Sequence, residues 1–198
     1  MILITTVSLG FSSTKKIKDV QLNYSATKPL DYTVALSHQD IVEIHPPFLG
    51  KSFNGFKEAL AFSESRGNYF VVNNYGYMGK YQFGSSALRA LGIQDRTDFL
   101  NDPELQEKAF VSILQRNKWI LKEYIEQYSG KTIRGVEVTE SGILAAAHLA
   151  GAGNVKRYLR SGGTVGFKDA FGTSIRYYMK KFAGYDVSHV EANRTAKI

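Results

Sequence analysis

The stretch TESGILAAAHLAGAG, residues 139–153, decides the fold of this chain. Thr139 is of a residue type that caps the start of helices, and Gly151 and Gly153 end the helical pattern. Between these limits, residues 143–150 are apolar on nearly every side of a helix. Because a helix without a polar face has to be buried, the stretch predicts a helix at the centre of a mostly helical globule.

Helical patterns lie on both sides of this central segment. Asn54 is a plausible N-cap, and Phe56, Ala59 and Leu60 follow at helical spacing, so we expect a helix that Gly67 ends. An Asp-Pro-Glu sequence at 102–104 is a strong start for a helix. The other predicted elements are short helices at 85–91 and 154–160, a long helix at 102–130, a loop or small hairpin at 131–138, and a last helix at 173–184.

The length and composition favour one folded domain after an N-terminal extension. The chain has 198 residues, of which 43% are hydrophobic, enough for one core. We interpret residues 1–50 as a leader and residues 51–198 as the catalytic domain. Residues 1–13 are either an atypical export signal or a frayed terminus, because they are apolar but lack basic residues. No segment is apolar for long enough to cross a membrane. The expected location is periplasmic or secreted.

Charge and residue counts narrow the possible functions. The chain has no cysteine, which excludes disulfides, zinc-thiolate sites and a cysteine nucleophile. Its net charge of +7 favours an anionic partner: nucleic acid, a membrane surface or an acidic polymer such as a bacterial wall. The basic residues are scattered and form no nucleic-acid-binding motif, so nucleic acid is not the expected partner. The four histidines are far apart in sequence, and we expect no metal and no cofactor.

The segment FSESRGNYFVVNNYGYMGKYQFG, residues 62–84, carries the candidate chemistry. Glu64 follows Leu60 by four positions and Phe56 by eight, so the three side chains share one face of a helix. Apolar surroundings and the negative end of the helix dipole both raise the pKa of a carboxyl group. Glu64 is therefore a candidate proton donor near neutral pH. The alternative is a surface glutamate at a fraying helix end.

The loop after Glu64 is rich in glycine, tyrosine and asparagine. Its glycines permit turns and the close approach of a ligand. Its tyrosines offer flat faces with a polar tip, which suit sugar rings and their hydroxyl groups. Asn73, Asn74 and Gln82 add paired donors and acceptors. This composition fits glycan recognition better than phosphate binding.

Two motifs give the chain a resemblance to a known family. Glu64-Ser65, with Gly76, Gly79 and Gln82 at twelve, fifteen and eighteen positions after the Glu, resembles the E-S…G-x-x-G-x-x-Q motif of soluble lytic transglycosylases. Residues 147–151, Ala-His-Leu-Ala-Gly, are similar to the A-Y-N-A-G motif that this family carries on a buried helix. The resemblance covers roughly residues 52–185. It implies a goose-type-lysozyme-like fold, mostly α in an α+β class, with a Gly/Tyr-rich active-site loop.

The resemblance also implies roles for single residues. Glu64 would be the catalytic acid and then the base. The expected substrate contacts are Ser65, Asn73, Tyr77, Tyr81, Gln82 and His148. The chain departs from the family where His148-Leu149 replaces an aromatic-Asn pair and where Lys80-Tyr81 replaces Leu-Met. His148 is either a hydrogen-bond partner of Glu64 or the sugar, or a satisfied buried histidine. Tyr81 is either a sugar contact or a packing residue.

By the chemistry of this family, Glu64 would protonate the oxygen between N-acetylmuramic acid and N-acetylglucosamine in peptidoglycan. It would then accept the proton of the muramic 6-hydroxyl, which closes a 1,6-anhydro ring. That reaction needs no second carboxylate, whereas most glycosidases use two. The candidates for a second one are Asp95, Asp98, Glu140 and Asp169. None has a compelling setting, which favours the transglycosylase. The alternatives are a lysozyme-type hydrolase of the same bond and a non-catalytic wall-binding module. We expect a monomer.

Overall fold

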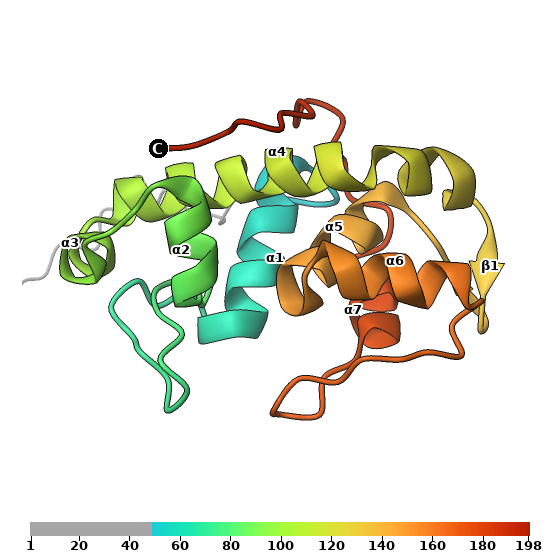
Figure 1. Cartoon of the computed structure of the whole chain (residues 1–198), viewed down its shortest axis with the longest axis horizontal. Coiled ribbons are helices and arrows are strands. Elements are labelled where there is room, and N and C mark those ends of the chain that lie inside the picture. The colour runs from blue at the N-terminus through green and yellow to red at the C-terminus, as the bar shows by residue number, and fades with distance from the viewer. Residues whose placement is uncertain (1–48) are drawn as a thin grey trace, which may run out of the picture. The chain divides into compact units, whose positions relative to one another are not determined.

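The predicted central helix is α5, Glu140–Ala150, in the computed structural model, which describes residues 49–198 (Figure 1). The Thr139 hydroxyl accepts a hydrogen bond from the Gly142 backbone N–H at 3.1 Å, as expected of an N-cap. Residues 141–147 are all buried. The prediction of a mostly helical unit around a buried helix is confirmed. Residues 1–48 are not among the described residues, so nearly all of the predicted leader, including the predicted export signal at 1–13, lies outside them.

Three helices pack around α5: α4 (Pro103–Tyr128), α6 (Ala152–Arg160) and α7 (Ile175–Lys181). The contact with α7 depends on Gly142. A Cβ atom at this position would lie 2.8 Å from the backbone oxygen of Met179 and 3.2 Å from its Cα. Because glycine has no Cβ, the two helix backbones come close together, which fixes where α7 presents its side chains.

The long helix α4 runs across the described unit, with α1, α2, α5, α6 and α7 on one side of it (Figure 1). Its start is as predicted: Asp102 accepts a hydrogen bond from the Leu105 N–H at 2.9 Å, and Pro103 is the first helical residue. The C-terminal segment lies on the other side, where the Asn193 N–H bonds to the Gln115 carbonyl.

Helix α1, Phe53–Ser65, begins two residues earlier than its predicted cap implies. Ser52, not Asn54, is the N-cap, and its hydroxyl accepts from the Gly55 N–H at 3.1 Å. The helix ends as Arg66 and Gly67 both take positive φ angles, 57° and 79°. The Gly67 N–H bonds to the Ala61 carbonyl, which closes the end of the helix.

The shorter elements agree with expectation except for one helix. Helix α2, Ser85–Leu91, ends at Gly92 as predicted, and residues 131–138 contain the hairpin of β1 (Thr132–Ile133) and β2 (Val136–Glu137). Helix α3, Arg96–Asn101, was not predicted, because it is short and polar and buries a single side chain. Among the helices of residues 49–198, none has the length and apolarity that a membrane span requires.

Candidate active site around Glu64

Glu64 lies in the last turn of α1 and is partly buried. Phe56 and Leu60, which share its helix face, have no exposed surface, so the predicted apolar setting is confirmed. The carboxylate oxygen Oε1 of Glu64 accepts a hydrogen bond from the Tyr178 hydroxyl at 2.7 Å. Tyr178 is a buried residue of α7, so this bond joins the end of α1 to the helix that packs on Gly142.

Burial raises the pKa of Glu64 above the ordinary value for a glutamate. The positive charges near it, His148 and Lys181, and the Tyr178 hydrogen bond act in the opposite direction, while the charge of Asp169 raises this pKa further. The net effect is a raised pKa, which confirms the prediction from the helix face. Burial and the Glu64 charge raise the pKa of Tyr178 as well, so its hydroxyl remains a donor.

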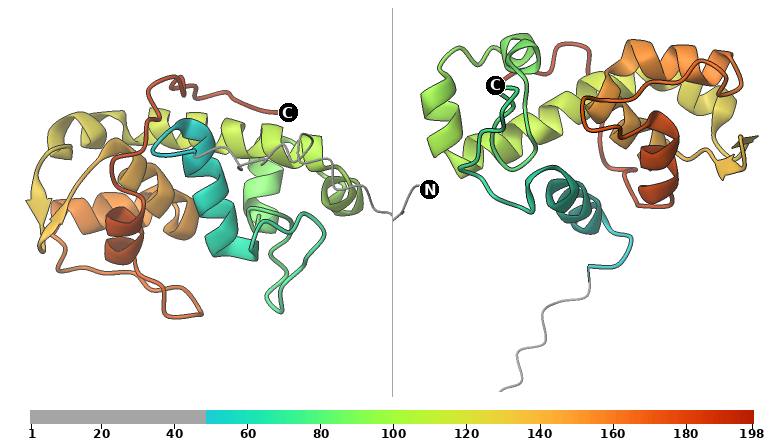
Figure 2. Two further views of the ribbon diagram at one scale, coloured as in Figure 1. Left: turned by 180° about the vertical axis from the view of Figure 1, so that it is seen from behind. Right: turned by 90° about the horizontal axis from the view of Figure 1, so that it is seen from below.

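Two loops lie on the side of the unit opposite α4 (Figures 1 and 2). The first loop, residues 67–83, follows α1, and the second loop, residues 162–173, precedes α7. The Ser65 hydroxyl ties the first loop to the end of α1 by donating to the Lys80 carbonyl at 2.7 Å. The two loops touch through exposed rings: Tyr75 and Phe171 pack edge to face with centroids 5.3 Å apart.

Asp169 is the one candidate for a second carboxylate whose charge acts on both Glu64 and Tyr178. Its Oδ1 accepts from the backbone N–H groups of Phe171 and Thr173, at 2.9 and 2.7 Å, and so holds the turn of the second loop. The other candidates are not among the groups that shift the pKa of Glu64. Asp95 caps α3, Asp98 is exposed in its first turn, and Glu140 pairs with Lys118 at 2.6 Å.

His148 is half-buried and bonds to the backbone rather than to Glu64, while its predicted contact with a sugar stays a prediction. Its Nε2 donates to the Tyr81 carbonyl at 2.8 Å, and its ring packs edge to face against Phe83 and Phe110. The hydrogen bond of Glu64 goes to Tyr178 instead. His148 acts on Glu64 through its charge, which lowers the carboxyl pKa.

Tyr81 is a packing residue and not a ligand-facing one. It has no exposed surface, and its ring stacks on Phe110 with centroids 3.9 Å apart. Its hydroxyl donates to the Glu107 carboxylate at 2.9 Å. Glu107 also pairs with Lys57 at 2.9 Å and Lys80 at 2.8 Å. The predicted sugar contact of Tyr81 is therefore wrong, because the side chain is turned into the core.

Ser65, Asn73 and Gln82 use their side chains to shape the first loop. The Asn73 Oδ1 accepts from the backbone N–H groups of Tyr75 and Tyr77 at 2.9 and 3.1 Å. Gln82, at a φ of 51°, donates its amide to the Gly79 carbonyl at 3.0 Å. Their predicted contact with a sugar stays a prediction, but their hydrogen bonds show what they do for the fold.

Among the predicted sugar contacts, Tyr77 has an exposed aromatic side chain, with 46% of the residue accessible to solvent. Its ring lies against Gly84, where a Cβ atom would come within 2.9 Å of it. Tyr75, one of the loop tyrosines predicted to suit sugar rings, is exposed as well. Four further exposed aromatic residues in the loops and adjoining helices were not predicted as contacts: Phe62, Phe70, Phe171 and Tyr177. Their exposure gives this side of the unit an aromatic surface that suits a flat, weakly polar ligand.

Three cavities of about 580 to 660 Å³ lie on the described residues, and Glu64 is not among the residues that line these three. The described part of the chain also has no group of three histidine or acidic side chains that could hold a metal ion. The candidate site is thus a single carboxyl group with a raised pKa, in the last turn of α1 before the first loop. Comparison with protein-family models, curated proteins and solved structures finds no match for this chain.

Proposed function

We propose that this protein cleaves the glycan strands of peptidoglycan as a lytic transglycosylase, with Glu64 as its one catalytic acid and base. The observation that carries the proposal is the raised pKa of Glu64, caused by burial at the end of α1 beside two loops with exposed aromatic rings. The motif resemblance of Glu64-Ser65 and the glycines after it supports the family and its lysozyme-like fold. A wall substrate implies a periplasmic or secreted location.

The geometry supports distinct roles for the groups around the bond to be cleaved. Protonated Glu64 donates its proton to the oxygen between the two sugars, which makes that oxygen a good leaving group. Tyr178 holds Oε1, which fixes the carboxyl orientation and stabilises the anion that forms. The ionised carboxylate then accepts the proton of the attacking hydroxyl. Exposed rings such as Tyr77 and Phe171 hold the neighbouring sugars by stacking.

The masses of the products test this proposal. Digestion of purified sacculi is expected to release fragments with 1,6-anhydro-muramic ends, which lack the water that hydrolysis adds. Fragments with reducing ends would establish the lysozyme-type hydrolase instead. Binding to sacculi without release of fragments would establish a wall-binding module. Retention of DNA in preference to wall material, in a salt-sensitive manner, would overturn the assignment altogether.

The position of Asp169 favours the hydrolase as the second candidate, because a second carboxylate that acts on Glu64 is what hydrolysis of this bond commonly uses. Two backbone N–H groups already occupy its Oδ1, which favours a structural role. The two mechanisms make opposite demands on the Asp169 charge. The transglycosylase does not use this charge in any step, whereas the hydrolase needs it to activate or replace water.

Asp169→Asn separates these two mechanisms, since asparagine keeps the Oδ1 acceptor and removes the charge. The Asp169 charge raises the pKa of Glu64, so its removal lowers that pKa. A general acid is active only while protonated, so the alkaline limb of the pH–rate profile is expected to move to lower pH. In the transglycosylase, the maximal rate changes by no more than about twofold, whereas in the hydrolase it falls by about 100-fold or more.

Asp98→Asn is the matched control, because Asp98 is an exposed acid on α3 that is not among the groups shifting the pKa of Glu64. This variant is expected to keep the wild-type profile. A shift of the alkaline limb to higher pH in Asp169→Asn would contradict the electrostatic role that we assign to Asp169. Rates measured on a soluble glycan fragment from pH 4 to 9 give both the maximum and the limb.

A further inference from the structure

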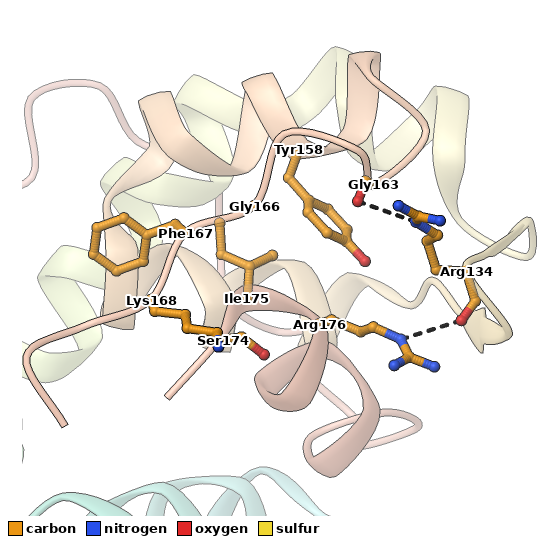
Figure 3. A pocket seen from close by; sticks show the side chains of 9 residues that line it. All are labelled: Arg134, Tyr158, Gly163, Gly166, Phe167, Lys168, Ser174, Ile175 and Arg176. Carbon is orange, nitrogen blue, oxygen red and sulfur yellow. Dashed lines mark hydrogen bonds between the residues drawn. The ribbon is translucent and has the colours of Figure 1, made fainter. Parts of the chain in front are cut away.

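A basic cavity of about 650 Å³ lies beside the second loop, away from Glu64 (Figure 3). The turn of the hairpin, α6, the second loop and the start of α7 all contribute to its wall. Three cations line it, Arg134, Lys168 and Arg176, and no acidic residue does. None of the three is in an ion pair with another residue of the described part of the chain. We refer to this cavity as the Arg134–Arg176 pocket.

The two guanidinium groups are held in place without loss of their charge. Arg134 donates from Nε to the Gly163 carbonyl at 3.3 Å, and Arg176 donates from Nε to the Arg134 carbonyl at 3.1 Å (Figure 3). Both bonds use Nε, so the terminal amino groups remain available. Gly163, at a φ of 79°, permits the close fit, since a Cβ there would lie 2.7 Å from the Arg134 side chain. Each arginine therefore presents a positioned fork of donors.

Tyr158 supplies the second, independent observation. It is 3% exposed, and its buried hydroxyl has no hydrogen-bond partner within residues 49–198. Figure 3 shows this hydroxyl pointing toward the space between the guanidinium groups of Arg134 and Arg176. A buried polar group without a partner is rare in folded proteins, because it gives up its hydrogen bonds to water and gains none in return. A ligand oxygen between the two arginines would accept from this hydroxyl.

The residues of the pocket wall also indicate the chemistry of the rest of the ligand. Phe167 and Ile175 line the pocket beside the cations, so part of the wall is apolar. A cavity of this size falls in the range of sites for small organic molecules and far exceeds a single ion. We propose that the Arg134–Arg176 pocket binds an oxyanion, a carboxylate or a phosphate, carried by an organic ligand whose apolar part lies against Phe167 and Ile175.

This site is distinct from the Glu64 carboxyl but shares its supports. The second loop carries both Lys168 of the pocket and Asp169, whose charge acts on Glu64. Arg176 and Tyr178 lie two positions apart on α7, and Tyr178 holds Glu64. An occupant of the pocket would therefore fix the second loop and the start of α7. Binding here does not require that the protein cleave anything, so the proposal stands apart from the proposed function.

Three small probes that carry a phenyl ring test the proposal: benzoate, its neutral counterpart of the same shape, benzamide, and phenyl phosphate. Calorimetry and the arginine Nε–H resonances are expected to show that the anions bind and benzamide does not. Each of Arg134→Gln and Arg176→Gln is expected to lower the affinity for the anions by about tenfold or more. The charge-matched control is Arg89→Gln on α2, which should leave the affinity unchanged. The anion that binds more tightly shows whether the pocket prefers a carboxylate or a phosphate.

Tyr158→Phe gives a readout that does not depend on the arginines. Because the hydroxyl has no partner, its removal is expected to leave the melting temperature unchanged or to raise it. The affinity for the anion is expected to fall. Equal binding of benzamide, no binding of either anion, or undiminished affinity in both arginine variants would overturn the proposal. The same titrations on Glu64→Gln keep it separate from catalysis: the anion site is expected to survive in a protein whose wall digestion is strongly reduced.

Discussion

Glu64→Gln is expected to lower the rate of wall digestion by about 10²–10⁴-fold while the protein stays folded. Glutamine has the size of glutamate and keeps an oxygen that can accept the Tyr178 hydrogen bond, so the junction of α1 and α7 is preserved. It has no proton to give to the glycosidic oxygen and no charge with which to take one back. The release of soluble fragments from sacculi measures the rate, and thermal melting followed by circular dichroism measures the fold.

Glu126→Gln is the matched control for this change, since Glu126 is an exposed glutamate on α4. It is expected to digest sacculi at the wild-type rate. Retention of full activity by Glu64→Gln would refute the assignment of the catalytic acid, whatever the products are. Loss of activity together with a lowered melting temperature would instead point to a role of Glu64 in stability, because the hydrogen bond to Tyr178 joins two helices.

Of the proposed substitutions, Glu107→Gln is expected to lower the free energy of unfolding the most, by on the order of 3 kcal/mol at pH 7. Glu107 is the common partner of Lys57, Lys80, Tyr69 and Tyr81, with every contact between 2.8 and 2.9 Å. The Lys80 side chain is only 6% exposed and would keep a single carboxylate partner, Glu58. A buried ammonium that loses a partner is costly, because its desolvation is no longer offset.

The same residue sets how stability depends on pH. Burial alone would raise the pKa of Glu107, but the hydrogen bonds from Lys80, Lys57, Tyr69 and Tyr81 outweigh it and lower this pKa to about 2. The unfolded chain, with a glutamate pKa of 4.5, binds the proton first. The stabilisation is therefore present above pH 4.5 and is lost as the pH falls toward 2. The total loss in the free energy of unfolding is about 3 kcal/mol.

Urea unfolding at pH 7 and pH 3 measures both effects. Wild type is expected to lose stability between these pH values, and Glu107→Gln is expected to lose less, since its residue 107 does not titrate. Glu104→Gln is the control on the same helix, because its pair with Lys108 is exposed to solvent and contributes little to stability. Equal pH dependence in wild type and Glu107→Gln would contradict the role given to Glu107.

The sequence predicted the helices well where their limits depend on local chemistry. Helix α2 ends at Gly92 and α4 begins at Asp102-Pro103, because capping and φ preference are properties of a few neighbouring residues. Helix α3 has no comparable apolar period, and Ser52 and Asn54 were equally good caps for α1 by residue type. The choice between such caps depends on how the preceding chain enters the helix.

The candidate site was predictable only in its local part. The setting of Glu64 follows from residues of its own helix, whereas its partner Tyr178 is 114 positions away and has the spacing of a core residue. Lys80 and Tyr81 looked like departures from a ligand-lining motif. The structure shows that both bind Glu107, on a helix whose relation to the loop no local pattern records. Long-range pairing of this kind requires the tertiary structure.

Under the proposed function, the contact between Tyr75 and Phe171 has a consequence for how a long polymer would reach Glu64. An aromatic pair of this type is worth about 1 kcal/mol beyond the area it buries, which corresponds to a roughly fivefold change in population. The root of the first loop is held far more firmly, by Ser65 and the charged cluster on Lys80. Under the proposed function, separation of the two tips would let a glycan strand enter sideways as well as by its end, while the root of the first loop stays fixed.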